Sequence, residues 1–598
     1  MGDVQQLHDE HAAAMAKASA QEQVSIDIQA VTSQATTSKS VDILELPAVT
    51  LTCGKDELVI QVIQPPSDLP QEESSSNSTG FLNYIPLDGI LTPFLPSSSS
   101  DTVTPPRRLP PGSVPFYNIL WAYINPDRTH LRIDFAEETS PKKHQLVVRQ
   151  LEFPLPPSDL TNARPERESL LSPTVPPPSP ATLDTFVSHL LDLAYPAPIQ
   201  RRKRAWVLVN PQAGPGGADK IFEKEVRPIF EAARMPLTVI RTSYSGEAVT
   251  LSQSLDISDY DIAVPCSGDG LPHEVFNGLS KRPDARTALA KIAVCHIPCG
   301  SGNAMSCNLY GTHRPSLAAL AIVKGVPTKL DLCSVTLQDG ERLTSFLSQA
   351  YGLIADLDIT TEHLRWMGAA RFTYGFLTLA IRKKCYPCDV AMKVEVGGKE
   401  EIRGHYARGV RSTESEVENG EGSGGEGIDD GEGGDETEGE GEGMPGLKYG
   451  TVNDKLPEDW EVVPHEKLGS FYAGNMGYMA PDANFFSAAL ANDGLLDLVT
   501  TNGDISLWKN IQMQLSVESG HFFDNPLVSY RKVSAFRLTP RYQDPNGVIS
   551  IDGEARPFAP FQVEVHKGLG LTLSKRGVFE APGPHGWDKV STIERLRA

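Results

Sequence analysis

Three glycine-rich turns each follow a short apolar run that predicts a buried β-strand. Their sequences are Asn-Pro-Gln-Ala-Gly at 210–214, Ser-Gly-Asp-Gly at 267–270 and Gly-Ser-Gly-Asn at 300–303. A strand that ends in glycine and turns into a helix exposes backbone N–H groups, and glycine lets a phosphate approach them closely. One such turn is weak evidence, because glycine also punctuates ordinary loops. Three turns on one edge of a parallel sheet indicate a nucleotide site.

Asp269 is the side chain in these turns that is best suited to chemistry. It stands between Gly268 and Gly270, so no neighbouring side chain shields its carboxylate from a substrate hydroxyl or a metal-bound phosphate. Glu274 follows at the start of a predicted helix at 274–278, where it could orient the turn or assist magnesium. Asp269 could instead cap that helix, since Asp is common before helices. The other two glycine turns make catalysis the favoured interpretation.

The elements that must position these turns alternate between strand and helix. Strands are predicted at 205–209, 237–240, 260–264 and 291–297, and helices at 218–233 and from about 303. Such alternation indicates an α/β layer with a parallel sheet. Beyond residue 329 the pattern changes to β runs at 392–396, 469–473, 495–500, 534–538, 548–551 and 562–566, which predicts a second, sheet-rich domain.

Composition divides the rest of the chain into a small module and linkers. Residues 1–40 are predicted to be disordered, and 41–153 to form a β-rich N-terminal module. Nine prolines between 154 and 180 predict an extended linker over 154–200. The α/β domain then covers 201–330 and the second domain 331–580, with an acidic disordered insertion at 409–450.

The net charge of −22 argues against nucleic-acid binding through a general basic field. More than half of it comes from residues 414–443, which hold 13 acidic side chains and no basic one. The basic run at 201–204 could contact anionic lipid, serve as an import signal or simply be a solvated approach to the first strand.

The eight cysteines and the polar start of the chain predict a cytoplasmic protein with reduced thiols. No apolar stretch reaches the roughly 18 residues that suggest a membrane span. We therefore expect any association with intracellular membranes to be peripheral.

Four motifs in this order carry a family resemblance. Residues 267–278, 298–304, 348–372 and 552–554 together resemble sphingosine (long-chain base) kinases, a branch of the diacylglycerol-kinase-like lipid kinases. The resemblance implies an α/β nucleotide-binding domain followed by a β-sandwich domain that holds the lipid, with ATP and Mg²⁺ between them. It implies a sphingoid base as the lipid substrate, and a homodimer is compatible with it.

The resemblance also implies roles for individual residues. Asp269 would be the general base for the primary hydroxyl of the lipid, and Mg²⁺ would bind through ATP, with no side chain assigned to it as a ligand. Ser267, Gly268, Gly270, Ser348 and Asp358 would join Asp269 around the substrate. The nucleotide would lie among Asn210, Pro211, Gln212, Thr242, Ser243, Tyr244, Ser245, Gly246, Glu274, Gly300, Ser301, Gly302, Arg365, Arg371, Asp552, Gly553 and Glu554.

Two features leave alternatives open. The first turn continues Pro215-Gly216-Gly217 where relatives commonly have Gly-Gly-Lys-Gly, so only backbone N–H groups of Gly216 and Gly217 remain for phosphate. Asp356 and Asp358 alternate on a strand-like run and would point the same way, which requires a cation, an amine or open solvent. A diacylglycerol or ceramide kinase is the second candidate, and a non-catalytic lipid-binding scaffold the third.

Overall fold

The computed structural model describes residues 42–46, 49–62, 112–139, 144–156, 178–214, 216–360, 385–418 and 442–584. The predictions made for residues 1–40 and for most of the acidic tract lie outside these ranges, as do Arg365 and Arg371.

The α/β domain is built on a parallel sheet whose central strands are buried along their whole length. The sheet order is β11-β10-β8-β9, and β12 also pairs with β10. Continuous apolar runs suit such strands because helices cover both faces of a parallel sheet. The strands are β8 (Ala205–Val209), β9 (Leu237–Arg241), β10 (Ile262–Ser267), β11 (Ala293–Val294) and β12 (Ile297–Pro298). The predicted strands are confirmed, although 291–297 forms two short pieces.

The helices of this domain are α3 (Ala218–Ile221), the π-helical η4 (Phe222–Val226), α4 (Arg227–Ala232), α5 (Glu247–Gln253), α6 (Gly270–Ser280), α7 (Ala285–Lys291), α8 (Ala304–Tyr310) and α9 (Pro315–Val323). Helices α3, α5, α6 and α8 each begin where a glycine-containing turn ends, and the other helices lie between or after them. The predicted helix at 274–278 therefore starts four residues earlier, at Gly270, and Glu274 lies inside it.

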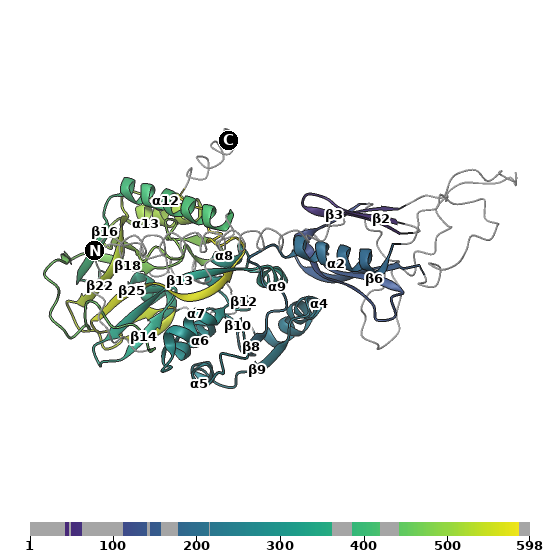
Figure 1. Ribbon diagram of the computed structural model, residues 1–598. Helices are drawn as coiled ribbons and strands as arrows, with labels where there is room; N and C mark the ends of the chain where they lie inside the picture. Colours follow the sequence, from purple (N-terminus) through teal and green to yellow (C-terminus); the bar gives the residue numbers. More distant parts are fainter. Residues whose placement is uncertain are drawn as a thin grey trace, which may run out of the picture.

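The second domain is one antiparallel sheet of eleven strands that curls on itself (Figure 1). Its strands are β13 (Val326–Leu337), β14 (Arg342–Ser345), β15 (Ser348–Gly352), β16 (Cys388–Val396), β17 (Glu461–His465), β18 (Leu468–Gly474), β21 (Leu496–Asn502), β22 (Ser529–Pro540), β23 (Val548–Ile551), β24 (Glu554–Pro557) and β25 (Phe561–Ser574). Buried aromatic side chains such as Tyr351, Phe471 and Phe536 fill one side of the curl. The predicted order of an α/β domain followed by a β-rich domain is confirmed.

Helices cover the second side of this sheet. These are α10 (Leu353–Thr360), α12 (Lys399–Glu418) and α13 (Leu507–Glu518), and a small hairpin, β19 (Tyr478–Ala480) with β20 (Ala483–Asn484), lies near them. Helix α12 occupies the first part of the predicted acidic insertion at 409–450, so that boundary is wrong. On the far side of the insertion the carbonyl of Glu442 accepts a hydrogen bond from Arg286 N at 3.0 Å.

The N-terminal module contains two sheets and one helix. The first sheet has the order β1-β2-β3-β4 and the second β5-β6-β7. Their strands are β1 (Ile43–Leu46), β2 (Val49–Cys53), β3 (Glu57–Val62), β4 (Ser113–Pro115), β5 (Ile119–Ile124), β6 (His130–Glu138) and β7 (Leu146–Pro154), with the 3-10 turn η2 (Phe116–Asn118) before β5.

Helix α2 (Pro180–Ala194) corrects the prediction that residues 154–200 form a linker. The hydroxyl of Ser179 accepts a hydrogen bond from Thr182 N at 3.1 Å, and Pro180 occupies the first helical position. Both are ordinary helix-start signals. Leu183, Phe186 and other apolar residues of α2 are buried. The helix packs on β5 and therefore belongs to the module.

Buried cations join the module to the α/β domain. Lys324 is 1% exposed, and its Nζ donates to the carbonyl oxygens of Ile119 (2.5 Å) and Ala194 (2.8 Å). Lys203 is buried beside it and donates to Val323 O at 2.8 Å. Burial lowers the pKa of Lys203 to about 8. These bonds satisfy carbonyl groups that would otherwise be buried without a partner.

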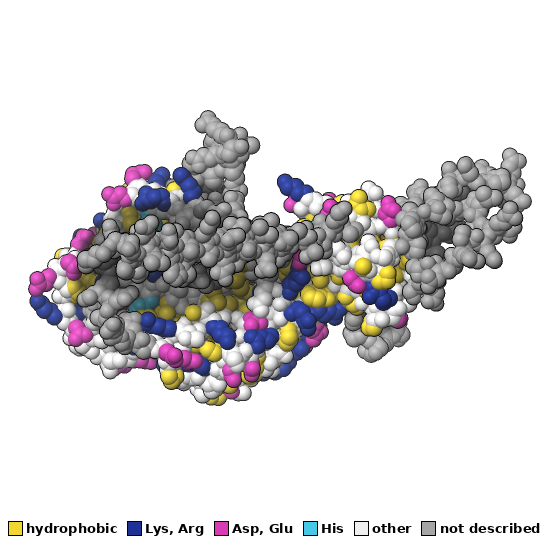
Figure 2. Space-filling view, viewed as in Figure 1, with side chains coloured by type: hydrophobic (Ala, Val, Ile, Leu, Met, Phe, Trp, Pro, Cys, Tyr) yellow, Lys and Arg dark blue, Asp and Glu magenta, His cyan; other side chains and the backbone are white. Residues whose placement is uncertain are grey.

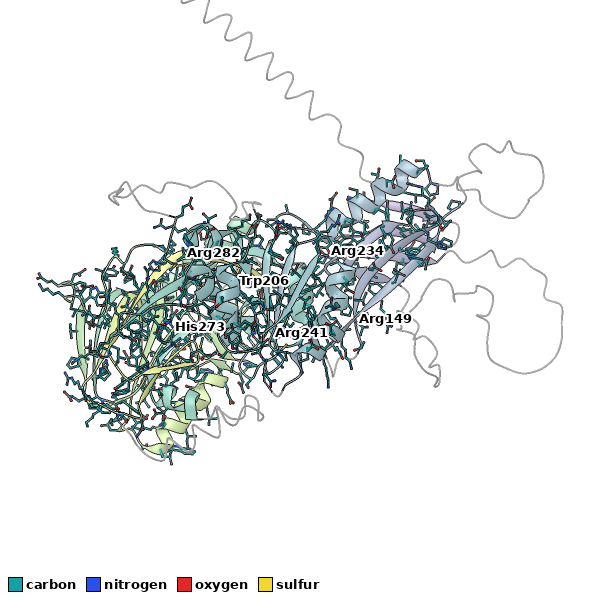
Figure 3. The ribbon with its side chains drawn as sticks, turned by 90° about the horizontal axis from the view of Figure 1, so that it is seen from below. Arg149, Trp206, Arg234, Arg241, His273 and Arg282 are labelled. Atoms are coloured by element: carbon teal, nitrogen blue, oxygen red, sulfur yellow. The ribbon has the colours of Figure 1, made fainter. Side chains whose placement is uncertain are left out.

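The same junction explains the basic run at 201–204. Arg204 pairs with Asp261 at 2.7 Å, and Arg201 pairs with Asp192 at 2.5 Å. Because Lys203 is buried, three of the four cations have partners within the protein, and Arg204 holds the start of β8. Arg234, labelled in Figure 3, reaches across to Asp134 of β6 at 3.1 Å.

On the face of the molecule that Figure 2 shows, the surface charge of the described residues is mixed. Lys and Arg side chains gather along the lower edge of the α/β domain and its border with the module (Figure 2). Acidic side chains are interspersed there and on the second domain. The large negative charge of the whole chain is therefore not a property of this surface.

Candidate active site

The turns that follow β8, β9, β10 and β12 meet at one edge of the parallel sheet. All these strands run in the same direction, so their carboxyl ends lie together. The chain passes from β8 to β9 on one side and returns to β10 on the other. A crevice at such a change of direction is where open α/β sheets bind ligands. The predicted convergence of the three glycine turns is confirmed.

Close backbone contact explains why glycine occupies these turns. A Cβ atom added to Gly300 would lie 2.4 Å from the Cα of Gly268, and one added to Gly214 would lie 2.6 Å from the carbonyl oxygen of Cys299. Real Cβ atoms do not approach so closely, so side chains here would force the turns apart. The turns after β8, β10 and β12 therefore form one continuous backbone surface.

Asp269 is held by the turn that follows β12. Its Oδ2 accepts a hydrogen bond from Ala304 N and its Oδ1 from Met305 N, both at 3.0 Å. Asp269 therefore caps α8, not its own helix α6, for which its side chain makes no capping bond. The carboxylate keeps 14% of its surface exposed. A fixed, partly exposed carboxylate at this edge is suited to act as a base toward a bound hydroxyl.

Asn303 is a residue of this site that the sequence interpretation did not single out. Its Oδ1 accepts from Gly300 N and its Nδ2 donates to Gly300 O, each at 2.8 Å. Asn303 has a φ of +55°, a conformation that Asn tolerates better than most residues. The side chain thus closes the turn 300–303. Its position after Gly-Ser-Gly was the signal that could have identified it.

Glu274, which lies on the helix that follows the turn 267–270, connects this helix to the loop 242–246. Its Oε2 accepts a hydrogen bond from Ala248 N at 3.1 Å, at the start of α5. Thr242 N in turn bonds the carbonyl of Val209 at 2.9 Å, so the loop is fixed to the end of β8. Tyr244 is 63% exposed, and Gly246 has a φ of +88°. The predicted residues Thr242, Ser243, Tyr244, Ser245 and Gly246 thus lie on the same edge as Asp269.

Asp552 has a different environment from the one predicted. It is fully buried, and its carboxylate accepts hydrogen bonds from Ser345 Oγ (2.6 Å), Leu347 N (3.0 Å) and Ser348 N (2.9 Å). His273 lies 2.8 Å away. Burial alone would raise the pKa of Asp552, but these hydrogen bonds hold it below the ordinary value. Because these bonds use its carboxylate oxygens, Asp552 holds the segment 345–348 in place and is not available to bind a nucleotide.

Glu554 is the member of the 552–554 motif that reaches the turn. After Gly553, whose φ is +82°, Glu554 places Oε1 only 3.1 Å from where a Cβ of Gly270 would be. Burial raises the pKa of Glu274, and the charge of Glu554 raises it further. Two carboxylates therefore face the edge beside Asp269.

Ser267 and the first turn make hydrogen bonds within their own loops. Ser267 is buried and its hydroxyl donates to Gly268 O at 2.6 Å. Asn210 Oδ1 accepts from Gln212 N at 3.0 Å. Gly216 N donates to Ala213 O at 3.0 Å and Gly217 N to Pro211 O at 3.4 Å. These last two N–H groups are used inside the loop, which counts against their predicted use for phosphate.

The prediction that Asp356 and Asp358 alternate on a strand is wrong. Both positions lie in α10, a helix and not a strand, so the period-two alternation does not apply to them. The carboxylate of Asp356 accepts a hydrogen bond from Tyr386 Oη at 2.6 Å. Helix α10 packs on β15, β18 and β23. Asp358 therefore lies in a helix of the second domain, and this helix follows β15, the strand that begins at Ser348.

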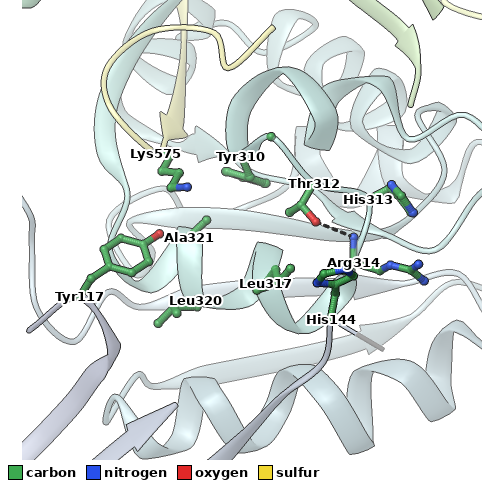
Figure 4. Close-up of a pocket in the computed structure, with 11 residues that line it drawn as sticks. Tyr117, His144, Tyr310, Thr312, His313, Arg314, Leu317, Leu320, Ala321 and Lys575 are labelled. Atoms are coloured by element: carbon green, nitrogen blue, oxygen red, sulfur yellow. Dashed lines mark hydrogen bonds between the residues drawn. The ribbon is translucent and has the colours of Figure 1, made fainter. Parts of the chain in front are cut away.

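A cavity of about 360 Å³ lies elsewhere, at the junction of the module and the α/β domain (Figure 4). Tyr117 and His144 of the module face Arg314 and Leu317 across it, and Lys575 lies at its end. Tyr310, the last residue of α8, also lines the cavity. Asp269 binds the first residues of the same seven-residue helix, so α8 connects this cavity to the turn 267–270.

Two family models match this chain. The model described as "Diacylglycerol kinase catalytic domain" matches residues 204–335, which contain all the glycine turns and Asp269. The model described as "Domain of unknown function (DUF7493)" matches residues 42–196. That range includes α2, in agreement with its packing on the module.

Relatives that match about two thirds of this chain show which family of lipid kinases it belongs to. The chain is 35% identical to "Sphingoid long chain base kinase 5" of Saccharomyces cerevisiae, covering 66% of this chain and 62% of that protein, less than two thirds of its length. It is 35% identical to "Sphingoid long chain base kinase 4" of Schizosaccharomyces pombe over 66% of this chain and 80% of that one. "Sphingosine kinase 1" of Arabidopsis thaliana is 32% identical, over 62% and 71%. The chain belongs to the sphingoid long-chain base kinase family.

Proposed function

We propose that this protein transfers the γ-phosphoryl group of ATP to the primary hydroxyl of a sphingoid long-chain base, giving the 1-phosphate. The observation that carries the proposal is the meeting of four βα turns around the fixed carboxylate of Asp269. The relatives described above are named for this activity. Sphingosine, dihydrosphingosine and phytosphingosine are the expected substrates.

In this reaction the protein contributes mainly position and charge. Backbone at the turns 210–214, 242–246 and 300–303 would hold the nucleotide phosphates, as at other strand-to-helix turns. Asp269 would accept the proton of the lipid hydroxyl while the hydroxyl oxygen attacks the γ-phosphorus. Arg365 and Arg371, which lie outside the described residues, are proposed to neutralise the charge that develops on the transferred group.

A magnesium ion fits the residues at this edge. Burial raises the pKa of Glu274, and the negative charge of Glu554 raises it further, so a cation near both carboxylates would relieve their repulsion. Magnesium in phosphoryl-transfer sites commonly takes one or two carboxylates and otherwise phosphate oxygens and water. Among the described residues no group of three or more His, Cys, Asp or Glu forms a metal cluster. Glu554 and Glu274 would hold the ion, which would neutralise phosphate charge when bound.

The main alternative is a kinase for diacylglycerol or ceramide, since the matching family model is described by the first of these lipids. The head group separates the candidates, because a sphingoid base carries an ammonium beside its hydroxyl. We propose that Asp358 binds this ammonium. A charge-assisted pair of this kind costs roughly 2–5 kcal/mol when one partner is removed.

The deciding experiment measures phosphate transfer from labelled ATP by the purified full-length protein. The lipids are sphingosine, phytosphingosine, ceramide and diacylglycerol, each in mixed micelles. We expect the two amine lipids to be preferred, and Asp358→Asn to raise their KM by about tenfold or more with little change in the KM for ATP. Better turnover of diacylglycerol would reject the substrate, and no turnover of any lipid would favour a scaffold.

We further propose that the protein works in the cytoplasm and contacts intracellular membranes peripherally. Helix α13 supports this idea: Trp508 is 67% and Leu515 58% exposed, and residues seven apart lie on one helix face. Tryptophan is also favoured at membrane interfaces. No helix within the described ranges is long and apolar enough to cross a bilayer.

Vesicle flotation tests the membrane contact. The double substitution Trp508→Ser and Leu515→Ser should reduce the fraction that floats with vesicles, while activity on micellar substrate stays unchanged. Val462→Ser on β17 is the matched control, since Val462 is 52% exposed on a different element. Equal flotation of all three proteins would reject α13 as the contact.

A further inference from the structure

His296 lies against the catalytic carboxylate, in the short connection between β11 and β12. Its side chain is completely buried, and its Nδ1 is 3.8 Å from Oδ1 of Asp269. The sequence interpretation assigned it no role. A buried imidazole beside the base of a proton-transfer reaction calls for an explanation.

The hydrogen bonding of the ring fixes its tautomer. Nε2 lies 3.0 Å from the carbonyl oxygen of Ser267, and a carbonyl oxygen can only accept, so Nε2 must carry a hydrogen. Burial lowers the pKa of His296, and Asp269 opposes this only in part, so the ring is neutral. The lone pair of Nδ1 therefore faces Asp269, and Nδ1 has no hydrogen-bond partner among the described residues.

The contact between Nδ1 of His296 and Oδ1 of Asp269 is repulsive when Asp269 is ionised and can become attractive when Asp269 is protonated. An ionised carboxylate and a lone pair repel each other, and in a buried site that repulsion is weakly screened. When Oδ1 carries a proton, the same two atoms can form an O–H···N hydrogen bond. The separation must shorten from 3.8 Å by about 1 Å to reach ordinary hydrogen-bond length.

We propose that His296 is a positioning residue that acts through Asp269, by accepting a hydrogen bond at Nδ1 once Asp269 has taken the proton of the lipid hydroxyl. This inference rests on the proposed function. In the step, the lipid O–H bond breaks and its proton ends on Oδ1. The lipid oxygen bonds to the γ-phosphorus, and the bond from that phosphorus to the oxygen of departing ADP breaks. Solvent takes the proton from Asp269 after the products leave.

Other titratable groups around the ring do not supply a competing charge. Tyr310 of α8 accepts a hydrogen bond from His296 N at 3.3 Å, and burial raises the pKa of Tyr310 well above its usual value. Burial also raises the pKa of Cys295 and of Cys307 to about 12, and that of Cys266 on β10 well above its usual value. All four groups are neutral near pH 7, so Asp269 supplies the charge that faces the ring.

Two substitutions separate this role from simple packing. In His296→Gln the amide nitrogen can still donate to Ser267 O, but the acceptor at the position of Nδ1 is lost. In His296→Asn the shorter side chain can place its oxygen near that position and loses the bond to Ser267. A packing role predicts that Gln is the better replacement, whereas the proposed role predicts that Asn is.

The first measurement is the pH dependence of kcat and KM for a sphingoid base with the full-length protein. We expect His296→Gln to lower kcat about tenfold with KM for ATP unchanged, and to move the acidic limb of the kcat profile to lower pH. His296→Asn should recover much of the loss. Normal kcat and an unchanged profile in His296→Gln, or losses that merely follow Tm, would overturn the proposal.

The second measurement does not depend on kinase activity. The ¹⁵N spectrum of the full-length protein labelled on histidine should show His296 as a neutral ring with Nδ1 unprotonated at pH 7, assigned by its disappearance in His296→Gln. Asp269→Asn, whose amide can donate to Nδ1, should shift that nitrogen. A protonated Nδ1 in the wild type would reject the proposal even for an active kinase. If no lipid is phosphorylated, the proposed function fails while this spectrum still tests the placement of His296.

Discussion

His273 Nδ1 lies 2.8 Å from Oδ2 of Asp552, and the two residues join the helix that follows the turn 267–270 to the second domain. His273 is on α6, and Asp552 follows β23. The same carboxylate holds the start of β15 through Ser348 N. One buried carboxylate therefore bonds both to the α/β domain and to β15 of the second domain, and the paired hydrogen bonds of Asn277 with Thr344 join the same two domains beside it.

Asp552→Asn should destabilise the protein by about 3 kcal/mol, because an amide cannot accept all these hydrogen bonds and leaves buried donors unpaired. Since the pKa of Asp552 is lowered in the folded state, its stabilisation is complete above the unfolded value of 3.8 and is lost as the pH falls through the folded value. The stability difference between the two proteins should therefore shrink below about pH 4. Urea unfolding at several pH values measures this.

The control for that experiment is Asp459→Asn. Asp459 pairs with Lys393 at the surface, so its removal should change the unfolding midpoint little. A difference between wild type and Asp552→Asn that stayed constant down to pH 3 would show that the stabilisation does not depend on ionisation.

Asp269→Asn should remove most turnover while the protein stays folded. Loss of a general base costs about 100- to 10,000-fold in kcat. One of the two N–H groups of Ala304 and Met305 would then face an amide NH₂, so Tm should fall slightly. Asp284→Asn, a carboxylate that pairs with Arg282, is the control. A folded Asp269→Asn with near-normal kcat would leave Asp269 as only the cap of α8.

The sequence was informative about the buried strands of the α/β domain and the turns that follow them. Buried apolar runs identified β8 and β10, and the parallel arrangement of strands was enough to bring 210–214, 267–270 and 300–303 together. Helix α2 was missed although Ser179 and Pro180 mark its start, because the many prolines before it led to the whole segment 154–200 being interpreted as a linker. The strand-like alternation at Asp356 and Asp358 was overridden by Gly352, whose φ of +82° turns the chain into α10.

Long-range contacts were beyond sequence reasoning. Asp552 binds His273 and the 345–348 backbone, residues more than 200 positions away. No local pattern separates a carboxylate with such partners from one that faces a nucleotide. The contact of His296 with Asp269 likewise depends on how β12 lies beside β10.

Gly300→Ala should damage the site through backbone displacement. The new Cβ would lie 2.4 Å from Gly268 Cα and 2.9 Å from Gly268 N. Overpacking of this kind should lower the free energy of unfolding by about 1–3 kcal/mol. Affinity for a non-hydrolysable ATP analogue, measured by calorimetry, should fall at least about tenfold. Gly446→Ala is the control, because nothing lies within 4 Å of its added Cβ. Unchanged ATP affinity in Gly300→Ala would place the nucleotide elsewhere.

The last prediction concerns the acidic tract between α12 and Glu442. Residues 421–440 are almost entirely Glu, Asp and Gly, a composition that cannot bury a core. Their replacement by a short Gly-Ser linker should leave kcat/KM on micellar substrate within about twofold, since shortening a loop changes its closure entropy only slightly.

A longer excision of 414–443 should lower Tm, because it removes the last turn of α12 and the Glu442 carbonyl that accepts a hydrogen bond from Arg286 N. Thermal melts and micellar assays of both variants make the comparison. If the short replacement abolished activity in purified protein, the tract would have to contribute to the site itself.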